Sequence, residues 1–175
     1  MLNEIDQASQ RNALALDRIE FLGRPAPPVG IERADGYDLR GRIAQGRSID
    51  EALPPYRRSV ELFRALGQDE DTRRLAEFHE RFVDLLLNLA DTAAGPNRAG
   101  RTLFDEGLRA YLAVAEQVRD SNSPVDARRV VDAMSRVRTA LDDAAAARAD
   151  ALWGDVRRTL EPIAQRAGTA AGTPQ

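Results

Sequence analysis

Apolar residues recur every three or four positions along most of this chain, which is the spacing that gathers them on one face of an α-helix. The strongest stripe lies between residues 69 and 93 and comprises Leu75, Phe78, Phe82, Leu85, Leu86 and Leu89. Similar stripes run through 3–22, 56–66, 102–118 and 124–153. The pattern predicts an all-α protein: a single-domain helical bundle or hairpin array of five to six helices with a long C-terminal helix.

Proline and glycine divide this pattern. The stretch RPAPPVG at 24–30 cannot continue a helix, and further glycines follow it before residue 47. We expect this region to be a loop with room for one helical turn. The expected organisation is an N-terminal amphipathic helix at 1–23, a Pro/Gly-rich linker at 24–47, a helical core domain at 48–167 and a flexible tail at 168–175.

Two serines mark predicted helix starts. The motif SIDE at 48–51 has the spacing of a capping box, in which the serine and the glutamate bond backbone amides of the first turn. Ser123 precedes Pro124, and proline is favoured at the first helical position because its missing amide hydrogen is not needed there. Within the first of these helices, Pro54 and Pro55 predict a break or a kink.

No glycine or proline interrupts the segment from Pro124 to Trp153, apart from the proline that starts it. One continuous helix there would be about 45 Å long at 1.5 Å per residue. The alternative is a break at Asp142–Asp143 that folds the segment into a hairpin. We also expect Gly154 to kink the chain beyond it.

The composition removes several classes of chemistry. The chain has no cysteine, which excludes disulfides, thiolate nucleophiles and cysteine metal sites. Charged residues make up 30% of the chain, but the net charge is only -3 because acids are interleaved among the arginines. This lack of a basic stripe argues against a nucleic-acid partner.

Every one of the 25 basic side chains is arginine. The absence of lysine is typical of a high-GC bacterial or phage genome; the alternative is an exported helical effector, or its partner, that escapes amine-directed tagging. No basic-then-apolar signal opens the chain, and its most apolar run, FVDLLLNLADTAA, is too polar to span a membrane. We expect a cytoplasmic protein with no membrane span, with non-classical export as the alternative.

The only histidine, His79, lies in RRLAEFHERF. Its neighbours three and four positions away along a helix are all apolar: Leu75, Ala76, Phe82 and Val83. This setting predicts a packed side chain. The Glu-x-x-His and His-x-x-x-His spacings of helical metal sites are absent, as are a glycine-rich phosphate loop and a Gly-x-Ser-x-Gly elbow. We therefore expect no metal, no cofactor and no catalytic residue.

Arg74 and His79 form the spacing Arg-x4-His, which resembles the short signature of the HEPN family of all-helical ribonucleases. The resemblance implies metal-independent, acid–base cleavage of RNA by Arg74 and His79 at a dimer interface. Here Leu75 follows the arginine where that family often has a polar residue, and no basic groove accompanies the motif. A HEPN-like ribonuclease is the catalytic alternative.

The stretch EALPPYRRSVELFRALG at 51–67 resembles the second helix of a tetratricopeptide unit. The matching residues are Ala52, Tyr56, Ser59, Val60 and Leu62. In that family, small residues let the paired helices approach and the aromatic ring fills the gap between them. A period of roughly 34 residues does not reproduce the pattern further along the chain. The resemblance implies an array of helical hairpins and not a true repeat solenoid.

We expect a non-catalytic helical module for protein–protein interaction, assembly or regulation. Its partner is expected to be another protein or a second copy of the chain, bound by the first helix and by the exposed face of the long C-terminal helix. The candidate interface residues are Ile5, Leu16, Ile19, Leu22, Met134, Val137, Leu141 and Trp153. Their stripes are wider than a small bundle needs, which suggests that a partner covers them.

Overall fold

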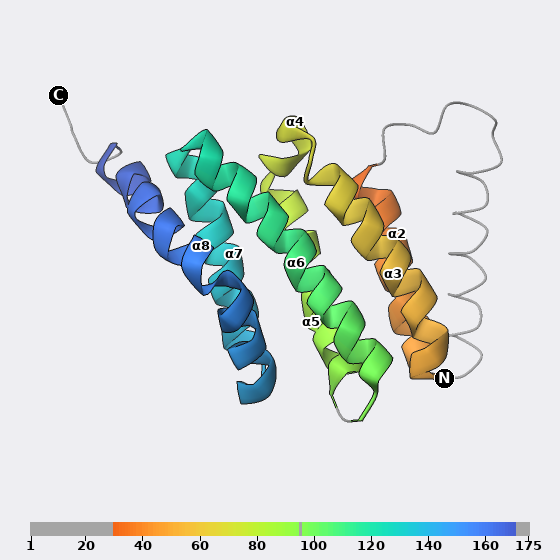
Figure 1. Ribbon diagram of the computed structural model, residues 1–175. Coiled ribbons are helices and arrows are strands. Elements are labelled where there is room, and N and C mark those ends of the chain that lie inside the picture. The colour runs from red at the N-terminus through yellow and green to blue at the C-terminus, as the bar shows by residue number, and fades with distance from the viewer. Residues whose placement is uncertain (1–29, 95, 171–175) are drawn as a thin grey trace.

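The computed structural model describes residues 30–94 and 96–170 (Figure 1). This part of the chain contains seven helices and no strand, which confirms the all-α prediction. The helices are α2 (Ile31–Gln45), α3 (Ile49–Leu66), α4 (Glu70–Arg73), α5 (Ala76–Ala93), α6 (Arg98–Ser121), α7 (Pro124–Ala140) and α8 (Asp143–Ala170). The helix predicted at 1–23 and the first residues of the predicted linker lie outside the described residues.

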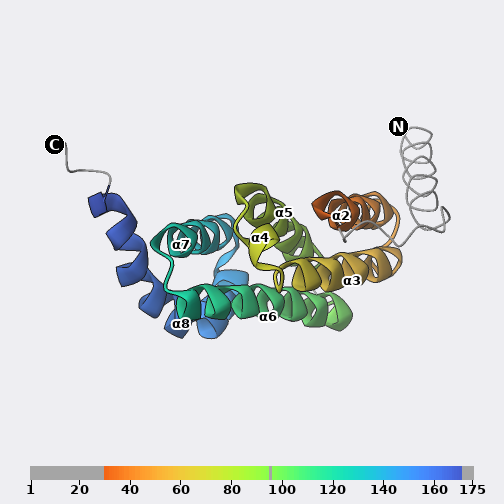
Figure 2. The same cartoon turned by 90° about the horizontal axis from the view of Figure 1, so that it is seen from above.

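Three consecutive hairpins, α2–α3, α5–α6 and α7–α8, stand side by side (Figure 1). Seen from above, α2, α5 and α7 form one layer and α3, α6 and α8 form the other (Figure 2). Neighbouring hairpins pack through both layers, since α2 contacts α5, α5 contacts α7, α3 contacts α6 and α6 contacts α8. The single turn α4 connects the first hairpin to the second. The described chain is therefore a short array of helical hairpins.

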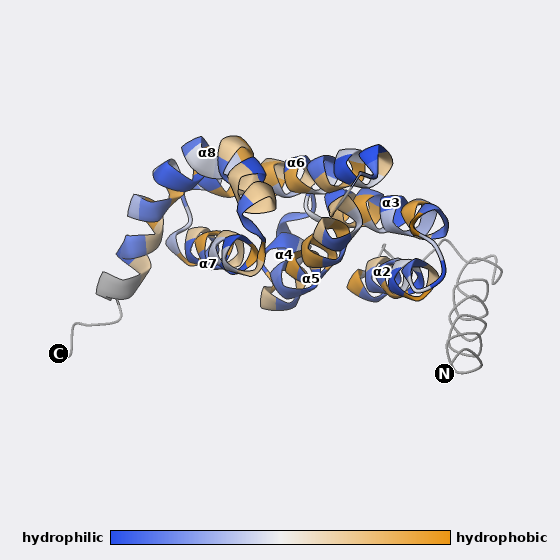
Figure 3. Ribbon diagram, turned by 90° about the horizontal axis from the view of Figure 1, so that it is seen from below, coloured by the Kyte–Doolittle hydropathy of each residue, from blue (hydrophilic) through white to orange (hydrophobic). Residues whose placement is uncertain are grey.

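Aromatic side chains form the centre of the core between the two layers. Phe63 of α3 stacks on Phe82 of α5 with ring centroids 5.0 Å apart, and Phe82 meets Tyr111 of α6 edge to face at 5.1 Å. Tyr111 in turn lies 5.6 Å from Trp153 of α8. Most of the helices carry hydrophobic residues on one side and hydrophilic residues on the other (Figure 3), and their apolar faces join this core. The aromatic chain ties all three hairpins together.

The prediction of a linker at 24–47 is wrong for most of its length, because 31–45 is the helix α2. Apart from Ile31 at its start, the buried residues of α2 are Ala34, Asp38 and Gly41, so the sequence shows no apolar stripe there. Gly41 explains how α2 can pack against α3: a Cβ atom at this position would lie 2.4 Å from the ring of Tyr56 on α3. Only glycine lets the two helices approach this closely. Tyr56, which the tetratricopeptide resemblance singled out, fills the gap between them and is fully buried.

The break or kink predicted at Pro54–Pro55 does not divide α3, which runs without interruption from Ile49 to Leu66. The two prolines cannot donate to the carbonyl groups of Asp50 and Glu51, but these lie in the exposed first turn, where water can bond them instead. Ser48 caps α3, since its hydroxyl accepts a hydrogen bond from the Asp50 amide at 3.2 Å. The reciprocal bond of the predicted capping box is not formed, because the Ser48 amide donates to the Ala44 carbonyl oxygen at 3.0 Å.

The segment 124–153 adopts the hairpin alternative. Helix α7 ends at Ala140, and Asp142 begins the next helix by accepting a hydrogen bond from the Ala145 amide at 2.8 Å. Ser123 caps α7 as predicted. The long C-terminal helix is α8, which passes through Gly154 without ending there. Helix α8 extends to Ala170, so the predicted tail does not begin at 168. Residues 171–175 lie outside the described residues.

Candidate functional site

His79 lies in the first turn of α5, just after a break in the predicted third helix. The break occurs at Leu75, whose backbone is extended (φ -77°, ψ 134°). His79 is 4% exposed. Its Nε2 lies 2.8 Å from the carbonyl oxygen of Arg73, the last residue of α4, and its Nδ1 lies 2.9 Å from the hydroxyl of Tyr111 on α6. The imidazole therefore connects three helices.

These two contacts specify the protonation of His79. A carbonyl oxygen can only accept, so Nε2 carries the hydrogen and donates it to Arg73, and Nδ1 accepts from the Tyr111 hydroxyl. Burial lowers the pKa of His79 from 6.5 to about 4, and the nearby guanidinium groups of Arg129 and Arg73 act in the same direction. The imidazole is thus neutral at pH 7. The prediction that it is a packed side chain is confirmed, but its two polar partners were not foreseen.

Arg74 does not join His79 in a shared cleft. Its guanidinium group is half exposed and pairs with Glu70 and, at 3.4 Å, with Asp126 of α7. A general base must reach the proton that it removes, and both nitrogens of His79 are already bonded inside the core. The Arg74–His79 pairing implied by the HEPN-like signature is not formed in this structure.

The candidate interface residues of the C-terminal half lie inside the chain. Met134, Val137 and Trp153 are almost fully buried, and Leu141 is partly buried against the same core. The apolar stripe at 124–153 is divided between α7 and α8, and its two parts face each other across the α7–α8 hairpin. This corrects the predicted exposed interface. Ile5, Leu16, Ile19 and Leu22 lie outside the described residues.

A buried carboxyl group, Asp38 of α2, was not recognised from the sequence because its helix was taken for a linker. It is 1% exposed and accepts two hydrogen bonds from Nδ2 of Asn88 on α5, at 2.9 and 3.1 Å. Burial raises the pKa of Asp38 from 3.8 to about 6, opposed by the Asn88 hydrogen bond and by Arg42, 3.5 Å away. The pair Asp38–Asn88 joins the first hairpin to the second.

Replacing Asp38 by asparagine is expected to stabilise the protein at pH 7 by up to about 3 kcal/mol, the equivalent of the raised pKa. The stability associated with the protonated carboxyl group is present below pH 3.8 and is lost as the pH rises through about 6. An amide does not titrate, so Asp38→Asn avoids that loss and can still accept from Asn88. Urea unfolding at pH 4 and pH 7 checks this: the advantage must vanish at pH 4. A stability advantage of Asp38→Asn that is equal at both pH values would contradict a raised pKa for the buried Asp38 carboxyl group.

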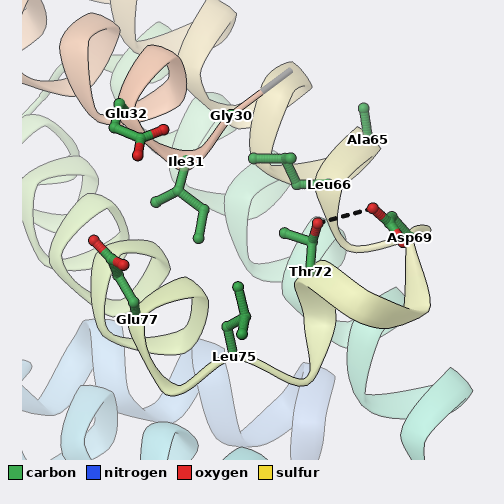
Figure 4. Close-up of a pocket in the computed structure, with 9 residues that line it drawn as sticks. All are labelled: Gly30, Ile31, Glu32, Ala65, Leu66, Asp69, Thr72, Leu75 and Glu77. Atoms are coloured by element: carbon green, nitrogen blue, oxygen red, sulfur yellow. Dashed lines mark hydrogen bonds between the residues drawn. The ribbon is translucent and has the colours of Figure 1, made fainter. Parts of the chain in front are cut away.

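An open hollow lies where α2 begins, between the end of α3, the turn α4 and the start of α5 (Figure 4). Its volume is about 500 Å³. Ile31, Leu66 and Leu75 point into it from three sides (Figure 4). Leu75 is 49% exposed, although its place in the stripe predicted that it would pack in the core. The extended backbone between α4 and α5 turns this side chain outward. We call this site the Leu75 hollow.

Carboxylate groups surround the Leu75 hollow. Glu32 and Glu77 lie on one side and Asp69 on the other, where the Thr72 hydroxyl donates a hydrogen bond to it at 2.8 Å (Figure 4). All three acidic residues are exposed, and no arginine is among the described residues that line the hollow. The site therefore offers an apolar floor with a negatively charged rim.

In the described residues no group of three or more histidine, aspartate or glutamate side chains is placed to hold a metal ion. None of the helices there combines the length and the apolar content needed to cross a membrane. No protein-family model matches the chain, and comparisons with curated proteins and with solved structures find no match.

Proposed function

We propose that the protein is a non-catalytic helical module for protein–protein interaction, and that the Leu75 hollow receives an apolar side chain of its partner. The observation that carries this proposal is the exposed Leu75, which faces Ile31 and Leu66 across an open hollow between the first hairpin and the start of the second. Exposed apolar surface arranged around a concavity is a common feature of protein-binding sites.

Association would remove the remaining water from Leu75. A leucine side chain contributes about 2 kcal/mol when it is buried completely, so covering the half that is exposed contributes about 1 kcal/mol, before the surface of the incoming side chain is counted. The carboxylates of Glu32, Asp69 and Glu77 add a preference for a basic residue beside the apolar one. The partner is thus a segment with an exposed apolar anchor next to arginine or lysine, from another protein or from a second copy of this chain.

Leu75→Asp is expected to weaken binding of this partner at least about tenfold, because it places a charge on the apolar floor of the hollow. Leu75→Asp should not lower the stability of the folded state. Leu75 is the N-cap residue of α5, and aspartate is among the residues preferred at that position. Val125→Asp is the matched control, since Val125 is 53% exposed in the first turn of α7, far from the hollow in sequence and absent from its lining.

The measurement is photo-cross-linking from position 72, where Thr72 lines the hollow, in cells that produce the protein. We expect one discrete adduct that is lost with Leu75→Asp and kept with Val125→Asp. Its mass identifies either a different protein or a second copy of the chain, and the purified pair then gives the affinity change. Adducts that both substitutions leave unchanged, or no adduct in any background, would overturn the proposal.

A further inference from the structure

A second hollow lies between α3 and α6, which pack side by side in one layer of the hairpin array (Figure 2). Its volume is about 500 Å³. Its floor is formed by Val60 on α3 and by Ala110 and Ala113 on α6, and the first two of these are almost fully buried. Because an alanine side chain ends at Cβ, α6 leaves space here that a longer side chain would fill. We call this site the α3–α6 hollow.

Charged side chains form the rim of the α3–α6 hollow. They are Arg57, Glu61, Arg64, Glu106 and Arg109. Both glutamates already have cationic partners, since Glu106 lies 3.7 Å from Arg57 and Glu61 pairs with Arg58 at 2.8 Å. Arg64 and Arg109 are exposed, and within residues 30–94 and 96–170 neither side chain forms an ion pair or a hydrogen bond. The hollow therefore carries two guanidinium groups that no acid of the described chain bonds.

The two unpaired arginines line the hollow at similar heights, one from each helix. Gly67 of α3 lies beside Val114 of α6, where a Cβ atom added to the glycine would be 2.5 Å from the valine side chain. Gly107 of α6 lies beside Val60 of α3, at 3.9 Å by the same measure. The two helices therefore run in the same direction, and this register places the unpaired arginines within about one helical turn of each other along the hollow. A single short segment can reach both.

We propose that the α3–α6 hollow binds an acidic segment of a partner protein, with its carboxylates on Arg64 and Arg109 and an apolar side chain on the floor between them. A guanidinium group offers two parallel N–H donors that match the two oxygens of a carboxylate. Most of the other arginines in the described chain pair with a carboxylate of the same chain, whereas a partner must supply the acid for these two. The two glutamates on the rim repel a phosphate backbone, which favours a short acidic peptide over a nucleic-acid strand.

This surface goes beyond the role proposed for the Leu75 hollow. The described residues that line the two hollows are all different. The acidic rim of the Leu75 hollow favours a basic segment, whereas the unpaired arginines of the α3–α6 hollow favour an acidic one. The two sites therefore bind different segments, and each can be tested while the other is intact.

The test uses a fluorescein-labelled peptide in which a single leucine is flanked on each side by three glutamates, titrated with the full chain and followed by anisotropy. We expect saturable binding that weakens about tenfold in Arg64→Ala/Arg109→Ala, because the charge-assisted hydrogen bonds to the peptide are lost. The lysine versions of the same two substitutions should lose less, since lysine keeps the charge without the planar pair of donors. The matched control Arg40→Ala/Arg98→Ala removes the same charge from exposed positions outside the hollow and should change the affinity less than about twofold.

A second pair of variants blocks the hollow without removing an arginine. Ala113→Glu places a carboxylate one helical turn from Arg109, where it supports the helix and competes with the peptide. We expect this variant to bind the peptide at least about tenfold more weakly. Ala99→Glu is its control, because it adds the same charge at an exposed position in the first turn of α6, outside the hollow. It should change the affinity less than about twofold.

Leu75→Asp should leave the binding of this peptide unchanged, so the failure of one site is distinguishable from the failure of the other. Equal losses in the two double-alanine variants, or in the two glutamate variants, would show a general charge effect and overturn the proposal. The same holds if the glutamine version of the peptide binds as tightly, or if the chain does not bind the acidic peptide at all. Tighter binding of a single-stranded RNA oligonucleotide that also depends on Arg64 and Arg109 would assign the hollow to nucleic acid and overturn the peptide proposal.

Discussion

Replacing Trp153 by alanine is expected to lower the free energy of unfolding by about 4 kcal/mol, a large part of the stability of a domain of this size. Trp153 is 3% exposed, and its indole N–H donates a hydrogen bond to the Leu108 carbonyl oxygen at 2.9 Å. Its ring lies beside Tyr111. The substitution would leave a cavity where α8 meets α6 and would remove the last ring of the aromatic chain. Urea unfolding followed by far-ultraviolet circular dichroism measures the change.

The same substitution tests the role that the sequence suggested for Trp153 as an interface residue. Because the side chain is buried within one chain, sedimentation should show the same oligomeric state before and after the change. Trp153→Phe keeps most of the hydrocarbon and loses the N–H donor, so it should remain folded at a cost of about 1 kcal/mol. Unchanged stability together with a new oligomeric state would instead assign Trp153 to a contact between chains.

Replacing His79 by glutamine is expected to change the pH dependence of stability by about 3 kcal/mol between pH 7 and pH 4. In the wild-type protein, the neutral imidazole is buried with a pKa of about 4, whereas the unfolded chain protonates near 6.5. The stability due to His79 is therefore complete above pH 6.5 and is lost as the pH falls towards about 4. Glutamine does not titrate. The difference in the free energy of unfolding between wild type and variant should therefore narrow by about 3 kcal/mol between pH 7 and pH 4.

Unfolding by urea at pH 7, 5.5 and 4 measures this gap. Asp38→Asn is the matched comparison, because its effect has the opposite sign: the raised pKa of Asp38 costs stability as the pH rises through about 6. The contributions of Asp38 and His79 to wild-type stability thus largely offset each other over the range they share. A gap for His79→Gln that does not change with pH would contradict a buried, neutral imidazole and would place His79 in contact with water.

The helix starts and the stripes on α5 and α6 could be predicted because their causes are local. Ser48 and Ser123 bond amides within three residues of themselves, and the leucines and phenylalanines of α5 bury a face that is apolar by composition alone. Helix α2 could not be recognised in this way. Its packing depends on Gly41 beneath the Tyr56 ring, which no pattern within α2 reveals.

The candidate sites also combine features that have local causes with features that depend on residues distant in sequence. The burial of His79 was predicted from its apolar neighbours, but Tyr111 is 32 positions away in the chain and could not be identified as its partner. Asp38 and Asn88 are 50 positions apart, and each is an ordinary polar residue when taken alone. Leu75 belongs to an apolar stripe by spacing, and only the break between α4 and α5 turns it towards solvent.

The amino-acid sequence by itself determined that the chain is helical, where several of its helices begin and that cysteine and lysine chemistry is absent, because periodicity, capping and composition act within one or two helical turns. Only the tertiary structure decided which stripes are covered by the chain's own helices, which polar groups are buried together and where the Leu75 hollow lies. Those outcomes depend on the approach of helices that are distant in sequence, and the spacing of residues within one helix does not encode the surface of its neighbour.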